Sequence, residues 1–183
     1  MISDTKVVAI GGGTGLSTML KGLKLHTHNI TAVVTVADDG GSSGILRSDL
    51  GMLAPGDVRN CVSALAEVDP VMGELLNFRF KDGSLKGHSL GNLFLAALNE
   101  TSSSFDEAVK KFSHLTGVVG TVYPVTNESV TLSALLEDGR LIEGESHIGV
   151  HHDGPKNGIV KLMVNPEKPK AVDGVIKALE KAD

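Results

Sequence analysis

The sequence predicts an α/β protein built on a parallel sheet, and two apolar runs with the residues between them carry the prediction. Residues 7–10 form a short apolar run, β-branched at three of its four positions, that ends in a cluster of glycines. Leucines and a methionine then recur at helical spacing over residues 16–23, and a second apolar run follows at residues 30–37. This order predicts one strand–helix–strand unit with a right-handed crossover.

The remaining elements follow from helix caps, periodicity and turn residues. Helices are predicted at residues 57–67, 70–80 and 89–99, and at 104–114, where Ser104 and Glu107 form a capping-box pattern. Residues 118–125 and 158–164 read as strands, and residues 171–181 as a final helix. Asp138-Gly139 between residues 130–137 and 141–144 predicts a two-residue hairpin.

Length and composition indicate one globular domain over residues 1–183. Hydrophobic residues make up 41% of the 183 residues and charged residues 21%, which is typical of a folded chain. A helix of an α/β protein usually leads into another parallel strand, so a chain that ends on its helix is predicted to lack a C-terminal part. The net charge of −5 and the 3% of aromatic residues argue against a nucleic-acid partner.

The expected location is the cytoplasm. The single cysteine excludes an internal disulfide, as expected in a reducing compartment. The N-terminus has no basic, apolar leader of the secretory kind. We expect no membrane span, because no stretch reaches the roughly 18 apolar residues that one requires.

The first candidate site is the glycine cluster between the first strand and its helix. Glycines allow close approach to the backbone, and free N–H groups at a helix N-terminus attract phosphate. The cluster lacks the third glycine of the dinucleotide fingerprint, where Leu16 stands, and the lysine of a Walker loop. The alternative is a tight turn without a ligand. The candidate phosphate-binding residues are Gly11, Gly12, Gly13, Thr14 and Gly15.

The second candidate site follows the second strand. Asp38 and Asp39 stand at its carboxyl end, which faces the ligand crevice in open α/β sheets. Their carboxylates are suited to a ribose hydroxyl or to magnesium, and Gly41, Ser42 and Ser43 offer amides and hydroxyls. The alternative is a flexible loop with solvated aspartates.

Two further clusters begin helices. Asp57, Arg59 and Asn60 are placed in a first helical turn, where Asp57 either caps the helix or joins a ligand site. His88, Ser89 and Asn92 belong to a glycine-flanked segment, and His88 and Asn92 are spaced to share a helix face. The alternative for His88 is a structural or exposed histidine.

Two other features are discounted. His147, His151 and His152 beside Asp153 resemble a metal site but fit a surface loop at a strand end better. Cys61 has apolar neighbours on a helix, which favours a buried, inert thiol over a nucleophile.

The motifs together resemble the CofD/YvcK family (UPF0052), and most closely its gluconeogenesis-factor branch. The segments that carry the resemblance are IGGGTGL at residues 10–16, TVADDGGSSG at 35–44, PGDVRN at 55–60, GHSLGN at 87–92 and GESHIG at 144–149. The resemblance implies a Rossmann-like, three-layer fold, with helices on both faces of a parallel sheet and a β-hairpin extension. It also implies that the family's C-terminal half is missing here.

The function implied by the resemblance is that of a cytoplasmic regulator. Members of this branch are associated with UDP-sugars such as UDP-N-acetylglucosamine, and with cell shape and cell-wall synthesis during gluconeogenic growth. The candidate residues of all four clusters would then form one ligand pocket, with Asp38 and Asp39 on magnesium, no assigned catalytic residue, and a homo-oligomeric assembly. The alternative is a magnesium-dependent transferase that takes a phosphate-linked group from a nucleotide diphosphate, as the 2-phospho-L-lactate transferases do. A third reading, a dinucleotide domain of the oxidoreductase type, is disfavoured by the Asp38-Asp39 segment.

Overall fold

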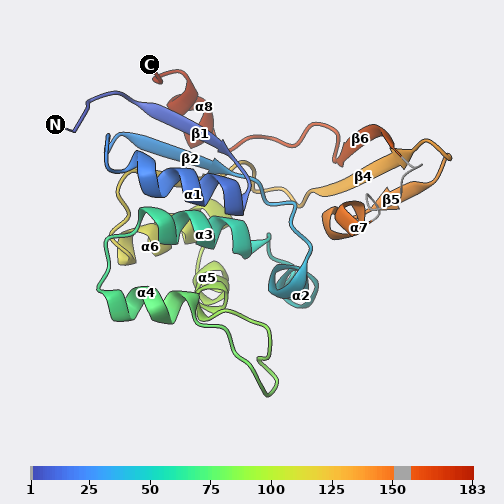
Figure 1. Ribbon diagram of the computed structural model, residues 1–183, viewed down its shortest axis with the longest axis horizontal. Helices are drawn as coiled ribbons and strands as arrows, with labels where there is room; N and C mark the ends of the chain where they lie inside the picture. The colour runs from blue at the N-terminus through green and yellow to red at the C-terminus, as the bar shows by residue number, and fades with distance from the viewer. Residues whose placement is uncertain (1, 151–157) are drawn as a thin grey trace.

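The computed structural model describes residues 2–150 and 158–183, which form a three-layer body with a protruding arm (Figure 1). The elements are, in order, β1 (Val7–Gly11), α1 (Gly13–Leu23), β2 (Ile30–Val34), α2 (Gly41–Leu50), α3 (Pro55–Leu65), α4 (Pro70–Asn77), α5 (Leu90–Glu100), α6 (Phe105–Leu115), β3 (Thr121–Pro124), β4 (Thr131–Leu136), β5 (Leu141–Glu143), α7 (Glu145–Val150), β6 (Ile159–Asn165) and α8 (Asp173–Leu179).

The body is built on a parallel sheet with the strand order β1-β2-β3. The register pairs Val7 with Ile30 and Gly11 with Val34, so β1 and β2 end at the same edge. The central strand β2 is almost entirely buried, as a strand covered on both faces must be. The prediction of an α/β protein with a parallel sheet is confirmed.

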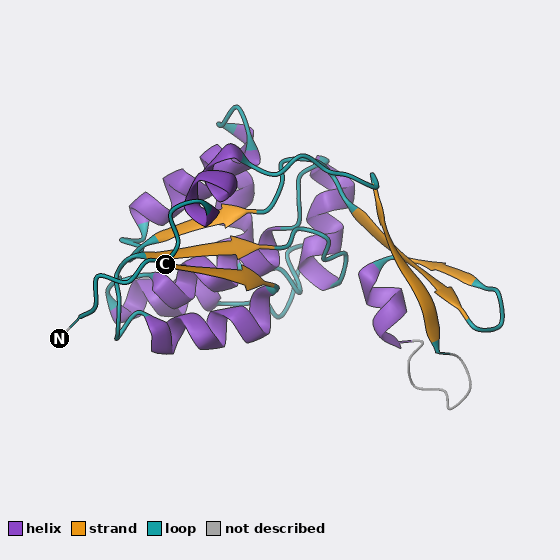
Figure 2. Ribbon diagram, turned by 90° about the horizontal axis from the view of Figure 1, so that it is seen from above, coloured by secondary structure: helices purple, strands orange, loops and turns teal. Residues whose placement is uncertain are grey.

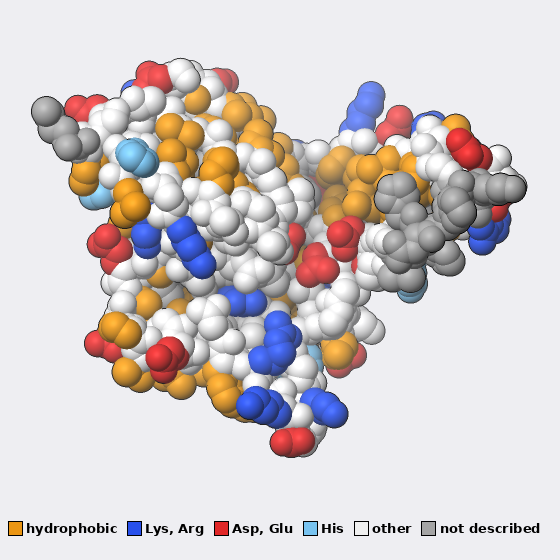
Figure 3. Space-filling view, viewed as in Figure 1, with side chains coloured by type: hydrophobic (Ala, Val, Ile, Leu, Met, Phe, Trp, Pro, Cys, Tyr) orange, Lys and Arg blue, Asp and Glu red, His pale blue; other side chains and the backbone are white. Residues whose placement is uncertain are grey.

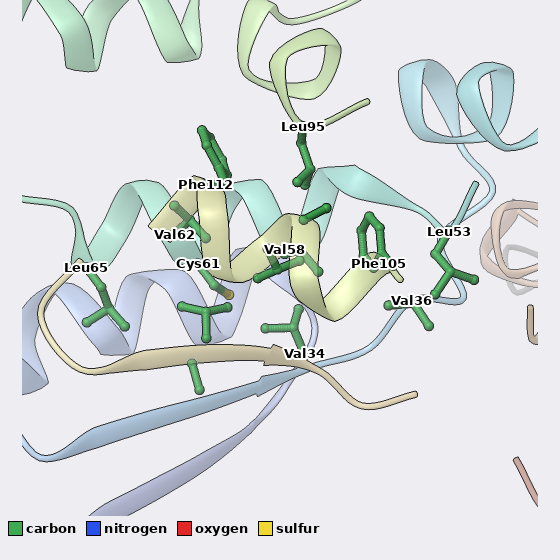
Figure 4. Close-up of a cluster of buried hydrophobic side chains, with 14 of the residues drawn as sticks. Val34, Val36, Leu53, Val58, Cys61, Val62, Leu65, Leu95, Phe105 and Phe112 are labelled. Atoms are coloured by element: carbon green, nitrogen blue, oxygen red, sulfur yellow. The ribbon is translucent and has the colours of Figure 1, made fainter. Parts of the chain in front are cut away.

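Helices cover the two faces of this sheet unequally. The larger core lies between the sheet and α1, α3, α5 and α6, and the fully buried Phe112, Leu65 and Val34 belong to it (Figure 4). On the opposite face, α8 packs Val175 against Val33 (Figure 1). The prediction of helices on both faces is therefore confirmed, with α8 as the thinner layer among the described elements.

The arm comprises the described part of residues 126–171 and contains β4, β5, α7 and β6 (Figure 2). Its sheet is antiparallel with the order β5-β4-β6. The predicted hairpin between β4 and β5 is confirmed, with Gly139 in its turn at a φ of 84°. The turn is three residues long and not two, because the Leu136 N–H donates to the Arg140 carbonyl at 2.9 Å across residues 137–139. At the base, Thr126 pairs with Ala171, and the Thr126 hydroxyl donates to the Lys170 carbonyl at 2.6 Å.

Two local expectations were wrong. The Gly/Ser stretch after Asp38-Asp39 is not a loop, because α2 begins at Gly41 within it. The segment at His147 is not a strand end, because it lies in the short helix α7. In both places contacts with distant residues, described below, stabilise helices that the local sequence only weakly favours.

Candidate functional site

Two adjoining cavities open at the carboxyl edge of the parallel sheet, beside the base of the arm. The glycine-loop cavity measures about 520 Å³, and the arm-base cavity about 400 Å³. They share the residues Gly12, Asp38, Asp57 and Glu145. The hollow between body and arm is visible in the space-filling view, with acidic side chains gathered in it (Figure 3).

The glycine-loop cavity is lined by all five residues of the predicted phosphate cluster. Gly12 precedes α1 in extended conformation and, as a glycine, has no side chain to cap this helix. The first N–H groups of a helix have no acceptor within it, and Thr14 and Gly15 are exposed. The positive end of α1 therefore faces the cavity, as an anion-binding site requires.

Asp57 lies directly behind this loop. Its carboxylate accepts hydrogen bonds from the Gly13 backbone N–H and from the Thr35 hydroxyl. A β-carbon on Gly13 would stand 2.8 Å from the Asp57 α-carbon, so only glycine allows α1 to approach α3 this closely. Asp57 consequently links the ends of β1 and β2 to the start of α3.

Three carboxylates, those of Asp38, Asp57 and Glu145, line both cavities. Burial raises the pKa of Asp57, and the neighbouring charge of Asp38 adds to this effect. Burial, followed by the charges of Asp38, Asp39 and Asp57, likewise raises the pKa of Glu145. The crowded negative charges therefore favour a cation or a proton at this edge.

This electrostatic arrangement predicts the pH dependence of an Asp57→Asn variant. A folded-state pKa above the unfolded value means that the folded state binds more protons between the two values. Ionisation of the Asp57 carboxyl group therefore lowers the free energy of unfolding as the pH rises through this window. We expect the free energy of unfolding of the wild type to fall, relative to Asp57→Asn, as the pH rises from about 4 through the raised pKa. Urea unfolding at a series of pH values measures the difference.

The matched control is Asp49→Asn, since Asp49 is exposed near the end of α2. The difference in the free energy of unfolding between Asp49→Asn and the wild type should not change with pH over the same range. A flat difference for Asp57→Asn as well would contradict the electrostatic account.

Asp39 has a different position from Asp38, although the two are adjacent in sequence. Its Oδ1 accepts a hydrogen bond of 2.8 Å from the backbone N–H of Ser146 in α7. Burial acts to raise the pKa of Asp39, but the hydrogen bonds from Ser146 outweigh it and lower the pKa. Asp39 lines neither cavity. It therefore holds α7 against the body, which places Glu145 beside Asp38.

Ser42 and Ser43 are buried in the first turn of α2 and face other helices. Ser43 Oγ accepts a hydrogen bond of 3.2 Å from the Gly56 backbone N–H at the start of α3. Ser42 Oγ lies 2.9 Å from His88 Nδ1. Neither serine, nor Gly41 beside them, lines the two cavities.

A buried polar network continues from Ser42. Asn92 Nδ2 donates to Ser42 Oγ at 3.1 Å, and Arg59 Nε donates to Asn92 Oδ1 at 3.3 Å. Ser89 caps α5 by accepting from the Asn92 backbone N–H. His88 and Asn92 thus lie close together, as expected, because both contact Ser42 Oγ. They do not share a helix face, since His88 precedes α5.

Arg59 does not have the position that the sequence suggested. Because α3 begins at Pro55, Arg59 lies in its second turn, and its guanidinium points to Asn92 and Asn77. Burial lowers the pKa of Arg59. Asn60 is half-buried. Neither side chain lines the two cavities, and their part in ligand binding stays a prediction.

The carboxylates fit magnesium only as a partner of a phosphate ligand. Within residues 2–150 and 158–183, no three metal-ligating side chains of His, Cys, Asp or Glu are grouped to hold an ion. Magnesium commonly uses one or two protein carboxylates together with waters and substrate phosphates. Asp38 and Asp57, facing the phosphate-type loop, provide such a donor set.

Of the features discounted in the sequence, only His147 and Cys61 lie among the described residues. His147 Nδ1 lies 2.9 Å from the Glu143 carbonyl, while His151, His152 and Asp153 lie outside the described residues. Cys61 is fully buried, and burial raises the pKa of its thiol to about 12. The prediction of a buried thiol is confirmed.

Glu145 is the carboxylate of the two cavities that the site prediction missed. It reaches the site from the arm, more than a hundred positions beyond the glycine cluster. The one available signal was its place in the GESHIG segment of the family resemblance.

The fold and site define an α/β protein with a glycine-rich, phosphate-type loop facing carboxylates. The chain belongs to the family described as 2-phospho-L-lactate transferase CofD, which it matches over residues 7–183. The relative from Clostridium acetobutylicum is 53% identical over 183 residues, which are 100% of this chain and 41% of that protein. The protein named gluconeogenesis factor from Bacillus subtilis is 45% identical, over 97% of this chain and 55% of its own length.

A solved structure is also similar to this chain. The crystal structure of a Bacillus halodurans protein superposes with a TM-score of 0.91 at 43% identity, covering 98% of this chain and 57% of that chain. The chain thus spans about half the length of the curated relatives it matches. Among the described residues, no helix is both long and apolar enough to cross a membrane.

Proposed function

We propose that this chain binds a nucleotide diphosphate of the UDP-sugar type at the carboxyl edge of its sheet, as a cytoplasmic regulator of the gluconeogenesis-factor kind. One observation carries the proposal: the first turn of α1, with Thr14 and Gly15 exposed, and the carboxylates of Asp38 and Asp57 line the same cavity. Helix N–H groups are suited to the diphosphate, and the carboxylates to an accompanying magnesium ion. Regulation of cell shape and cell-wall synthesis, through protein partners and as a homo-oligomer, belongs to the same proposal.

The second candidate is a magnesium-dependent transferase of a phosphate-linked group. The match to a family described as a transferase over residues 7–183 favours it. In that case Asp38 and Asp57 would hold the magnesium ion, whose chemistry is to neutralise developing charge on the transferred phosphate. A regulator shows binding without turnover, so an assay that detects product separates the two functions.

Calorimetric titration with UDP-N-acetylglucosamine and with GDP, each with and without magnesium, tests the proposal. We expect magnesium-dependent binding that Asp38→Asn weakens at least about tenfold, because Asp38 lines both cavities. The exposed Asp49→Asn serves as the matched control and should bind as the wild type does. Binding by Asp38→Asn at wild-type strength would contradict the site, and preference for GDP would favour the transferase.

A further inference from the structure

The arm-base cavity differs in chemistry from the glycine-loop cavity with which it is continuous. Apolar side chains make up most of its wall: Val36 follows β2, Val125 follows β3, and Leu132, Val164 and Pro169 come from the arm. Gly12, Asp38, Asp57 and Glu145 form its junction with the glycine-loop cavity. At about 400 Å³ it is within the range of small-molecule sites.

The side-chain hydroxyls of this cavity are already hydrogen-bonded, and its carboxylates lie at the junction. The Thr126 hydroxyl donates to the Lys170 carbonyl at 2.6 Å and accepts from the Glu128 backbone N–H at 3.0 Å. The Thr35 hydroxyl donates to Asp57. A ligand group in the cavity would therefore meet apolar side chains on most sides and carboxylates at one end.

These surroundings select among ligand groups. A polyhydroxylated sugar would lose hydrogen bonds to water that the apolar wall cannot replace. An anionic group would be repelled by the carboxylates at the junction. A neutral planar base has fewer polar groups than a sugar and gains apolar contact area on its ring faces, and its ring N–H can donate to a carboxylate at the junction.

From this we infer that the arm-base cavity is the subsite for the neutral, planar base of the nucleotide whose phosphates bind at the glycine loop. The inference rests on the proposed function and deepens it, because it assigns the base to the arm. It follows that the sugar of a UDP-sugar lies outside this cavity. The arm then takes part directly in ligand selection, through Leu132 of β4 and Val164 of β6.

The test compares uridine diphosphate with inorganic pyrophosphate, both with magnesium, on the whole chain. For the wild type we expect uridine diphosphate to bind at least about tenfold more tightly, because only this probe carries a nucleoside, and the cavity variants assign the preference to the base. Val164→Trp fills the cavity from an edge strand. This variant should weaken the binding of uridine diphosphate about tenfold and change the binding of pyrophosphate less than about twofold.

Val160→Trp is the matched control, since Val160 is exposed on the same strand and does not line the cavity. Leu132→Ala is a second variant, which removes apolar contact without adding bulk. It should weaken the binding of uridine diphosphate and leave the binding of pyrophosphate unchanged. Equal binding of both probes to the wild type, or an unchanged preference in both cavity variants, would overturn the subsite. A wild-type chain that binds neither probe would overturn the proposed function itself.

Discussion

Gly13→Ala is expected to lower the free energy of unfolding by about 3 kcal/mol, at the upper end of the usual cost of overpacking. The added β-carbon would stand 2.7 Å from the Asp57 carboxyl carbon and 2.8 Å from the Asp57 α-carbon. The Asp57 carboxylate alone could rotate away from the new β-carbon. The Asp57 α-carbon cannot, because it belongs to the backbone of α3. The substitution therefore forces α1 away from α3 and disrupts the hydrogen bond from Gly13 to Asp57.

Gly15→Ala is the matched control, because it lies in the same turn of α1 and a β-carbon there meets no atom within 4 Å. Alanine at an unstrained helical position stabilises by about 0.5–1 kcal/mol through the lower entropy of the unfolded chain. Urea unfolding followed by circular dichroism gives both values. Equal effects of the two substitutions would contradict the role of Gly13 as the contact point of α1 and α3.

The parts of the fold that the sequence predicted are those with local physical causes. Ser104 caps α6 by accepting from the Glu107 N–H, as the capping-box pattern indicated. The β1–α1–β2 unit follows from hydrophobic periodicity and its glycine turn. Because parallel strands end at one edge, the meeting of the glycine loop with Asp38 was also predictable.

The parts that the sequence did not predict depend on contacts between distant segments. The helix α2 begins with glycines and serines, which have low helix propensity, and its formation depends on burial of Ser42, Ser43 and Leu46. The short helix α7 is held by Asp39 at Ser146. In the same way, Glu145 enters the site only because the arm folds back toward the body.

The position of Arg59 shows why the direction of a side chain cannot be predicted from a sequence pattern. Its place near the start of α3 is compatible with a phosphate or with the protein interior. The packing of α5 decides between them: a β-carbon on Gly91 would stand 2.9 Å from Arg59 Cδ, so α5 lies directly on this side chain. Asn92, one position further along, then accepts from Arg59 Nε.

Asn92→Leu is expected to lower the free energy of unfolding by about 3 kcal/mol, the range for losing a buried hydrogen bond to a charged group. Asn92 is buried between Arg59 and Ser42, and leucine has a similar shape but neither accepts nor donates. The substitution leaves Arg59 Nε without its acceptor in surroundings that already disfavour the charged guanidinium, since burial lowers the pKa of Arg59.

Asn77→Leu separates the effect of burial from that of the hydrogen bond. Asn77 Oδ1 accepts from the same guanidinium at 2.8 Å, but Asn77 is exposed, so water replaces the lost acceptor. We expect this variant to lose about 0.5 kcal/mol, as surface substitutions commonly do. Urea unfolding measures the free energy of unfolding of both variants. Equal losses would show that burial of the Ser42–Asn92–Arg59 network does not increase the cost of removing its hydrogen bonds. A larger loss for Asn92→Leu means that this network holds α2, α3 and α5 together behind the carboxylates, and that the site depends on residues that do not line its cavities.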